Sequence, residues 1–340
     1  MTIPLFSVPH PVLAEVFNHI PTAEIVSLSL CSKYSYLLIK LFRNEPKNPG
    51  FLLVEGHRLG FWIEKEDFLG DYFVSKKPTN TEAIQNFKNY KNIPCEFDEL
   101  GRLSTYWEDT VLGFKLFTEY TADLFGVTVS RIIIGTTDAA WMIDWVNEWQ
   151  RGTTVKTVHA DMLEVINEEE YCRFLRSKPT RSLFIGAQAP QNFQFEKLPV
   201  VETLSLRSSY WVTLDHLLTM EIKNFSTYTK SKFNTSDVNT FLKHWLVGGS
   251  PRLRYLCLEI ENLSMDDVFQ GLEDRVALVQ RPREYEWVPE AILNFNVGHD
   301  ITRDNGVTAT FVRCASWTVE LGWTGVIIVD WPDINGNSFV

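Results

Sequence analysis

Apolar residues near the start of the chain recur at the spacing of short α-helices. The first predicted helix has its apolar positions at Val12, Leu13, Val16, Phe17 and Ile20. Pro21 ends it, because proline lacks the N–H that a continuing helix needs. Thr22 can cap a second helix, and Ser32 opens a third that is rich in leucine. We therefore predict three short helices between residues 11 and 42.

This helical segment has more apolar surface than it can hide. A domain below about 40 residues seldom folds alone, so part of that surface needs a cover. Residues 1–45 hold three Lys or Arg and three Asp or Glu, so we expect apolar contact to dominate any interface here. Residues 43–50 follow with two prolines and a glycine, which predicts a linker. The expected domains are residues 1–45 and 46–340.

Strands are expected within residues 51–63 and 71–75. After residue 105 the pattern predicts a repeating order of helix, loop and strand. Several predicted strands share an apolar-x-x-apolar-x-apolar pattern, and they begin at Val129, Val155, Val201, Leu217 and Leu253. With Leu183 added, the middle positions lie about 25 residues apart on average, within the leucine-rich-repeat range. The predicted fold class is α/β: an N-terminal three-helix unit followed by a degenerate leucine-rich-repeat-like α/β domain.

Local signals bound several later elements. Residues 237–247 predict a helix that Ser236 caps and Gly248 ends. A further helix is expected over 264–272. The sequence Asp304-Asn305-Gly306 predicts a hairpin turn between strands within 294–311. Residues 326–329 predict a last strand.

Composition narrows the classes of function. The 340 residues are 45% hydrophobic and carry a net charge of −11, which fits a globular chain and disfavours a general nucleic-acid binder. The five cysteines have no paired spacing, which is typical of a reducing compartment. We find neither a signal-peptide pattern at the start nor an apolar run of about 18 residues, so no membrane contact is expected. The expected location is cytoplasmic, nuclear or both.

No motif of catalysis, phosphate binding or zinc binding has the required spacing, so we predict no catalytic, cofactor-binding or metal residues. Gly248-Gly249-Ser250 is interpreted as a helix end and turn. The adjacent pairs Asp215-His216 and His299-Asp300 are interpreted as surface or hairpin residues. Trp141, Trp145 and Trp149 lie at four-residue steps, and we favour ordinary core over an exposed aromatic platform.

The N-terminal helices resemble an F-box. Val8-Pro9 stands where that family has Leu-Pro, and Cys31-Ser32-Lys33 matches its Val-Ser-Lys. Ser35 replaces the usual aromatic residue. The apolar positions of the family are matched by Leu13, Val16, Ile20, Ile25, Leu28 and Leu30.

The remainder resembles nematode-type F-box proteins that have a type-2 F-box-associated domain. Residues 209–218, 237–253 and 298–306 carry this resemblance. It implies a substrate-recognition subunit of a Skp, cullin and F-box (SCF) ubiquitin ligase. The F-box would bind a Skp-type adaptor and through it a cullin, the C-terminal domain would bind a target protein, and other subunits would transfer ubiquitin.

The resemblance also implies site residues. Those expected to contact the adaptor, or to shape that contact, are Pro9, Leu13, Val16, Ile20, Leu28, Leu30 and Cys31. For the target we expect outward positions on a strand of the repeat, namely Arg254, Tyr255 and Glu259. Two alternatives stay open: an F-box scaffold that recruits no target for degradation, and an enzyme on an α/β scaffold.

Overall fold

The chain forms two compact units, Met1–Lys156 and Thr157–Val340, in a computed structural model. The residues that the structure describes are 7–43, 50–55, 58–65, 68–76, 93–97, 103–151, 153–177, 179, 181–228, 231–288, 291–315 and 323–331.

The first unit begins with the three predicted helices, α1 (His10–His19), α2 (Thr22–Cys31) and α3 (Lys33–Phe42). Pro9 and Pro21 directly precede α1 and α2, where a missing N–H costs no helical hydrogen bond. Ser32 caps α3, since its side chain accepts a hydrogen bond from the Ser35 backbone N–H. The three predicted helices are therefore confirmed, but the predicted cap of the second is wrong, because Pro21 and not Thr22 stands at the cap position of α2.

A sheet and two helices complete the first unit. Its strands are β1 (Gly50–Glu55), β2 (Arg58–Lys65), β3 (Phe68–Lys76), β4 (Cys95–Phe97), β5 (Leu103–Trp107) and β6 (Val129–Ile134), in the order β6-β1-β2-β3-β5-β4. The helices are α4 (Thr110–Phe125) and α5 (Trp141–Trp149). Helix α4 ends at Gly126, whose φ of 65° is the left-handed conformation that glycine adopts at least cost.

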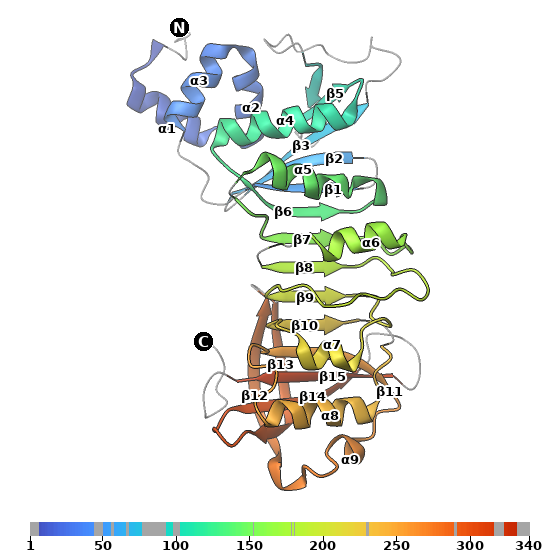
Figure 1. Cartoon of the computed structure of the whole chain (residues 1–340). Coiled ribbons are helices and arrows are strands. Elements are labelled where there is room, and N and C mark those ends of the chain that lie inside the picture. The colour runs from blue at the N-terminus through green and yellow to red at the C-terminus, as the bar shows by residue number, and fades with distance from the viewer. Residues whose placement is uncertain are drawn as a thin grey trace. The chain divides into compact units, whose positions relative to one another are not determined.

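Five parallel strands in register form the first part of the second unit. They are β7 (Thr157–Ala160), β8 (Ser182–Ile185), β9 (Thr203–Leu206), β10 (Asn224–Thr227) and β11 (Tyr255–Glu261). The helices between them are α6 (Glu168–Leu175), α7 (Leu214–Thr219) and α8 (Thr235–Leu246), and α9 (Met265–Val268) follows β11. Helices α6, α7 and α8 cover one face of these strands (Figure 1). One register row is buried throughout: Val158, Leu183, Leu204, Phe225 and Leu256.

Two sequence predictions are corrected in this region. The stretch that begins at Leu217 is not a strand, because Thr213 caps helix α7 and the strand starts only at Asn224. The cap of α8 is Asn234, not Ser236. Asn234 and Asp237 bond each other's backbone N–H groups in a capping box.

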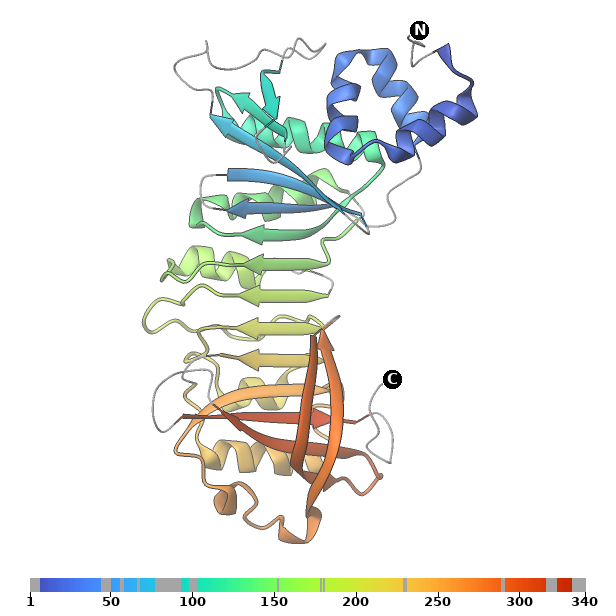
Figure 2. The same ribbon diagram turned by 180° about the vertical axis from the view of Figure 1, so that it is seen from behind.

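An antiparallel sheet continues from β11. It consists of β12 (Val276–Val288), β13 (Ala291–Thr302), β14 (Thr308–Ala315) and β15 (Trp323–Asp330), and β15 pairs with β11. The predicted turn between β13 and β14 is present, with Gly306 at φ 87°. The hairpin of β12 and β13 crosses the face of the strands that lies away from the helices (Figure 2). Strand β12 was not predicted from the sequence.

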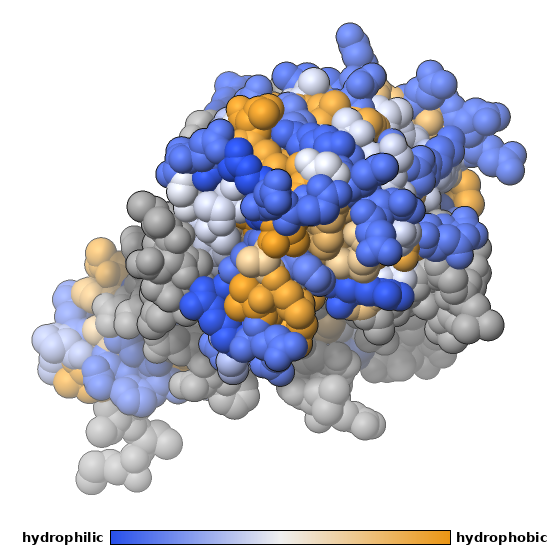
Figure 3. All heavy atoms as spheres, turned by 90° about the horizontal axis from the view of Figure 1, so that it is seen from below, coloured by the Kyte–Doolittle hydropathy of each residue, from blue (hydrophilic) through white to orange (hydrophobic). Residues whose placement is uncertain are grey.

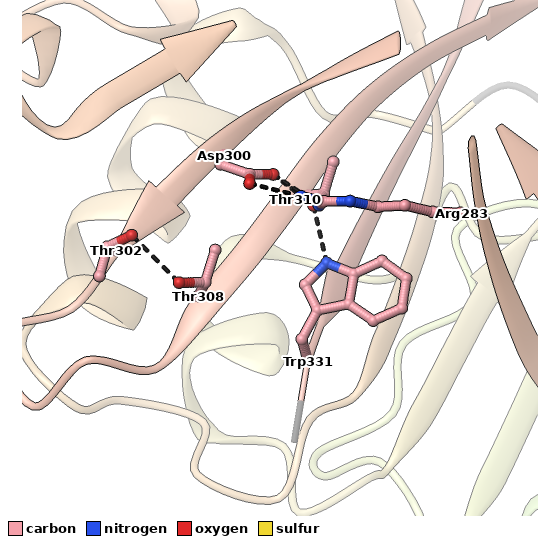
Figure 4. Close-up of polar contacts among 6 residues, drawn as sticks. All are labelled: Arg283, Asp300, Thr302, Thr308, Thr310 and Trp331. Atoms are coloured by element: carbon pink, nitrogen blue, oxygen red, sulfur yellow. Dashed lines mark hydrogen bonds and ion pairs between the residues drawn. The ribbon is translucent and has the colours of Figure 1, made fainter. Parts of the chain in front are cut away.

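A buried cluster lies under this hairpin. Its residues are Tyr255, Cys257, Tyr285, Val312, Ile327, Val329 and Trp331. Polar side chains close one side of the cluster: Arg283 is hydrogen-bonded to Asp300 and Thr310, and the indole N–H of Trp331 donates to Thr310 over 2.7 Å (Figure 4). Apolar packing and a paired charge thus hold the hairpin over the sheet.

Candidate partner-binding surfaces

Helix α3 presents an apolar ridge to solvent. Tyr34, Leu37 and Leu41 lie at i, i+3 and i+7, so they share one side of the helix, and they are 58%, 51% and 71% exposed. Val12 of α1 is 48% exposed as well. We call the three residues of α3 the helical ridge. Grouped exposed apolar side chains of this size mark a binding surface more often than scattered ones do.

The first and third helices are held together beside the ridge. The rings of His10 and Phe42 lie 4.5 Å apart, which joins the start of α1 to the end of α3. On the inner side of α3, Ser35, Leu38 and Ile39 are buried. The ridge is therefore what remains after the helices have formed their own small core.

The seven predicted adaptor residues divide by exposure. Pro9 and Cys31 are exposed, and Val16, Ile20 and Leu28 are half-buried. Leu13 and Leu30 are 1% and 0% exposed, so they lie beneath the surface. The sequence reasoning missed Tyr34, Leu37 and Leu41 as surface residues, although their i, i+3, i+7 spacing carried the signal.

Another side of the helical segment packs on α4. The side-chain oxygens of Ser29 and Tyr120 are hydrogen-bonded at 2.7 Å. Asp123 of α4 accepts hydrogen bonds from the Tyr36 hydroxyl and from Lys40, the latter at 2.5 Å. These two donors hold the pKa of Asp123 below its ordinary value. The helical segment thus belongs to the compact first unit.

The structure corrects the expectation that the strand residues chosen for target binding face outward. Tyr255 and Glu259 are 2% and 0% exposed. The ring of Tyr285, on the β12–β13 hairpin, stacks on Tyr255 at 5.8 Å, and burial raises the pKa of Tyr255. Arg254 stays partly exposed, and it is bonded to Asp330 at 2.6 Å.

The motifs that were not interpreted as catalytic or ligand-binding have structural roles. Gly248 ends α8 with φ 97°, and the Ser250 hydroxyl donates to the Leu217 carbonyl. His216 bonds the Thr213 backbone N–H at the start of α7, and Asp300 is paired with Arg283. The three tryptophans of α5 are half-buried, and the rings of Trp141 and Trp145 contact Phe114 of α4.

Two kinds of feature are absent from the described ranges. Among those residues, no three or more His, Cys, Asp or Glu side chains are grouped so that they could hold a metal ion. No helix there has the length and apolar content needed to cross a membrane.

Comparison with known proteins places both parts of the chain in known domain classes. Residues 5–47 match the family model of the F-box domain, and residues 189–258 match the model described as F-box associated. The chain thus contains an F-box domain and an F-box-associated region, which confirms the resemblance drawn from the sequence. Over 305 residues it is 23% identical to the Skn-1 dependent zygotic transcript 15 protein of Caenorhabditis elegans, and this match covers 80% of the chain and 84% of that protein. No solved structure matches.

Proposed function

We propose that this protein is a substrate-recognition subunit of an SCF-type ubiquitin ligase. The F-box would bind a Skp-type adaptor and, through it, a cullin, while the second unit would hold a target protein. The observation that carries the proposal is the helical ridge, because it lies in the matched F-box and leaves apolar side chains uncovered. The protein would act in the cytoplasm, the nucleus or both.

In this role the chain brings the target close to the other subunits of the ligase. It forms and breaks no covalent bond itself. Binding the adaptor and the target at once turns ubiquitin transfer into a reaction within one assembly, which raises the effective concentration of the target. F-box and F-box-associated domains are typical of non-enzymatic adaptors, and we propose the same for this chain. It requires no cofactor for that purpose.

The test is co-purification of the full chain with a Skp-type adaptor, using Leu41→Asp as the disruptive variant. A carboxylate in an apolar interface is left without a partner, so we expect at least a tenfold loss of adaptor affinity. Leu163→Asp is the matched control, since Leu163 is 59% exposed and lies in the second unit. Equal capture of both variants would contradict the role given to the ridge.

A second candidate is an F-box scaffold that binds the adaptor without directing degradation. Reconstitution with adaptor, cullin and its RING subunit, together with ubiquitin, ATP and the activating and conjugating enzymes, separates the two roles, with ubiquitin transfer to the chain itself as the readout. Transfer that Leu41→Asp abolishes supports the ligase role. Capture of the adaptor without any transfer favours the scaffold.

A further inference from the structure

One edge of strand β12 has no strand partner among the described residues. Among the described strands β12 pairs only with β13, so its other side presents backbone N–H and C=O groups without a strand partner. Proteins usually protect such edges with proline, bulges or charge. The second part of β12 has all three devices, because a bulge contains Arg281 and Pro282, and Glu284 and Glu286 follow.

The first part of β12 has none of them. Val276–Gln280 reads Val-Ala-Leu-Val-Gln, with neither charge nor proline. Five residues of strand extend over about 17 Å, which is the common length of a strand in a sheet. This edge is therefore long enough to pair with one more strand.

Exposed apolar side chains lie beside this edge. Leu278 is 59% exposed and Val297 is 51% exposed. Leu278 pairs with His299 and Gln280 pairs with Val297, so Leu278 and Val297 share one face of the hairpin. The ring of Phe269 lies 5.0 Å from that of His299 and extends the same face. Figure 3 shows the end of the second unit that carries α8 and α9, where apolar side chains gather in a strip between hydrophilic ones.

We infer that Val276–Gln280 is a docking edge at which an extended segment of the target protein adds to the sheet as a further strand. The backbone groups of the edge would supply the hydrogen bonds, and an apolar side chain of the segment would pack against Leu278 and Val297. That this segment comes from a degradation target rests on the proposed function. A second copy of the chain is the less favoured occupant, because two chains of net charge −11 repel each other.

The first test is hydrogen exchange of the free full chain. In an antiparallel pair, neighbouring residues point their amides alternately toward and away from the partner strand. The amides of 276–280 that point away from β13 should exchange at least a hundredfold faster than those bonded to it. Slow exchange of every amide in 276–280 in a monomeric sample would overturn the proposal, because another part of the chain would then cover the edge.

The second test uses a fluorescent nine-residue peptide that alternates valine with threonine and carries a lysine at each end. We expect binding by fluorescence anisotropy, together with slower exchange at 276–280. Leu278→Lys should weaken binding at least tenfold, and so should a proline at the centre of the peptide. Val247→Lys is the control, since Val247 is 85% exposed at the end of α8. Equal binding by both protein variants, or no binding by the wild type, overturns the proposal.

Two further measurements separate the remaining outcomes. Sedimentation of the wild type and Leu278→Lys detects pairing between copies, and a dimer that this variant abolishes would assign the edge to a second chain and overturn the target assignment. Adaptor capture by Leu278→Lys should equal that of the wild type. If the wild type does not bind the adaptor at all, the proposed ligase role is refuted, while the peptide result still stands.

Discussion

Arg283 of β12 and Asp300 of β13 form a two-pronged ion pair, with both guanidinium-to-carboxylate distances at 2.7 Å. The side chains are 4% and 15% exposed. A buried pair of this kind depends on both partners, because either charge alone would lie in an apolar setting without compensation. The pair lies beside the buried cluster to which Tyr255 and Trp331 belong, so it helps to hold the β12–β13 hairpin over that face of the sheet.

Removal of one partner should therefore be costly. We expect Asp300→Ala to lower the free energy of unfolding by about 3–5 kcal/mol, measured by urea denaturation. Asp304→Ala is the control, because Asp304 pairs with Arg275 but is 84% exposed, and it should cost less than about 1 kcal/mol. Similar small losses in both variants would show that the buried pair contributes little.

Two leucines of the F-box should differ in their effect on stability. Leu13 is 1% exposed and Leu41 is 71% exposed. Leu13→Ala creates a cavity and should cost about 2–5 kcal/mol. Leu41→Ala should change stability by less than about 0.5 kcal/mol. Thermal unfolding of the two variants tests this difference, and a large loss in Leu41→Ala would mean that the ridge is part of the core.

Asp330 should make stability fall as the pH rises. Burial raises its pKa to about 6, against the pairing with Arg254 and Arg303. The folded chain thus binds this proton more tightly than the unfolded chain, whose carboxyl has an ordinary pKa near 3.8. The stabilisation of the folded chain by this proton is fully present below pH 3.8 and is lost as the pH rises through 6. Urea denaturation at pH 4.5 and 7 should show this loss in the wild type and not in Asp330→Asn. The same difference in both proteins would contradict the prediction.

Asp123 should have the opposite effect on the free energy of unfolding, which it should raise as the pH rises. The hydrogen bonds from Lys40 and Tyr36 lower its pKa below 3.8, so its contribution is present above that value and is lost as the pH falls through the lowered pKa. Because both charged side chains are about half exposed, Asp123→Asn should cost less than about 1 kcal/mol at pH 7. At pH 2 the wild type and the variant should unfold alike, as measured by circular dichroism. A persistent gap at pH 2 would assign the effect to packing.

Local signals in the sequence predicted much of the fold. Pro21 between α1 and α2, the serine cap of α3 and the glycine of the β13–β14 turn act within a few residues, and these elements form as expected. Strand β12 escaped prediction because Arg281 and Pro282 interrupt its pattern, and only the structure shows that they form a bulge.

The candidate sites were less predictable, since exposure depends on distant residues. Nothing near Tyr255 in the sequence indicates that Tyr285 covers its ring. In the F-box, family positions identified Leu13 and Leu30, which form the core, more readily than Leu37 and Leu41, which face solvent. The repeat-like description of β7–β11 stays a prediction, as does the domain boundary at residue 45.

The contacts of Ser29, Tyr36 and Lys40 with α4 have a thermodynamic consequence for the whole first unit. A ligand that binds only the folded form stabilises everything that unfolds together with its site. An adaptor that bound the helical ridge would therefore raise the melting temperature of the whole first unit, strands β1 to β6 included. In a cell, the chain without a bound adaptor would then be the shorter-lived species.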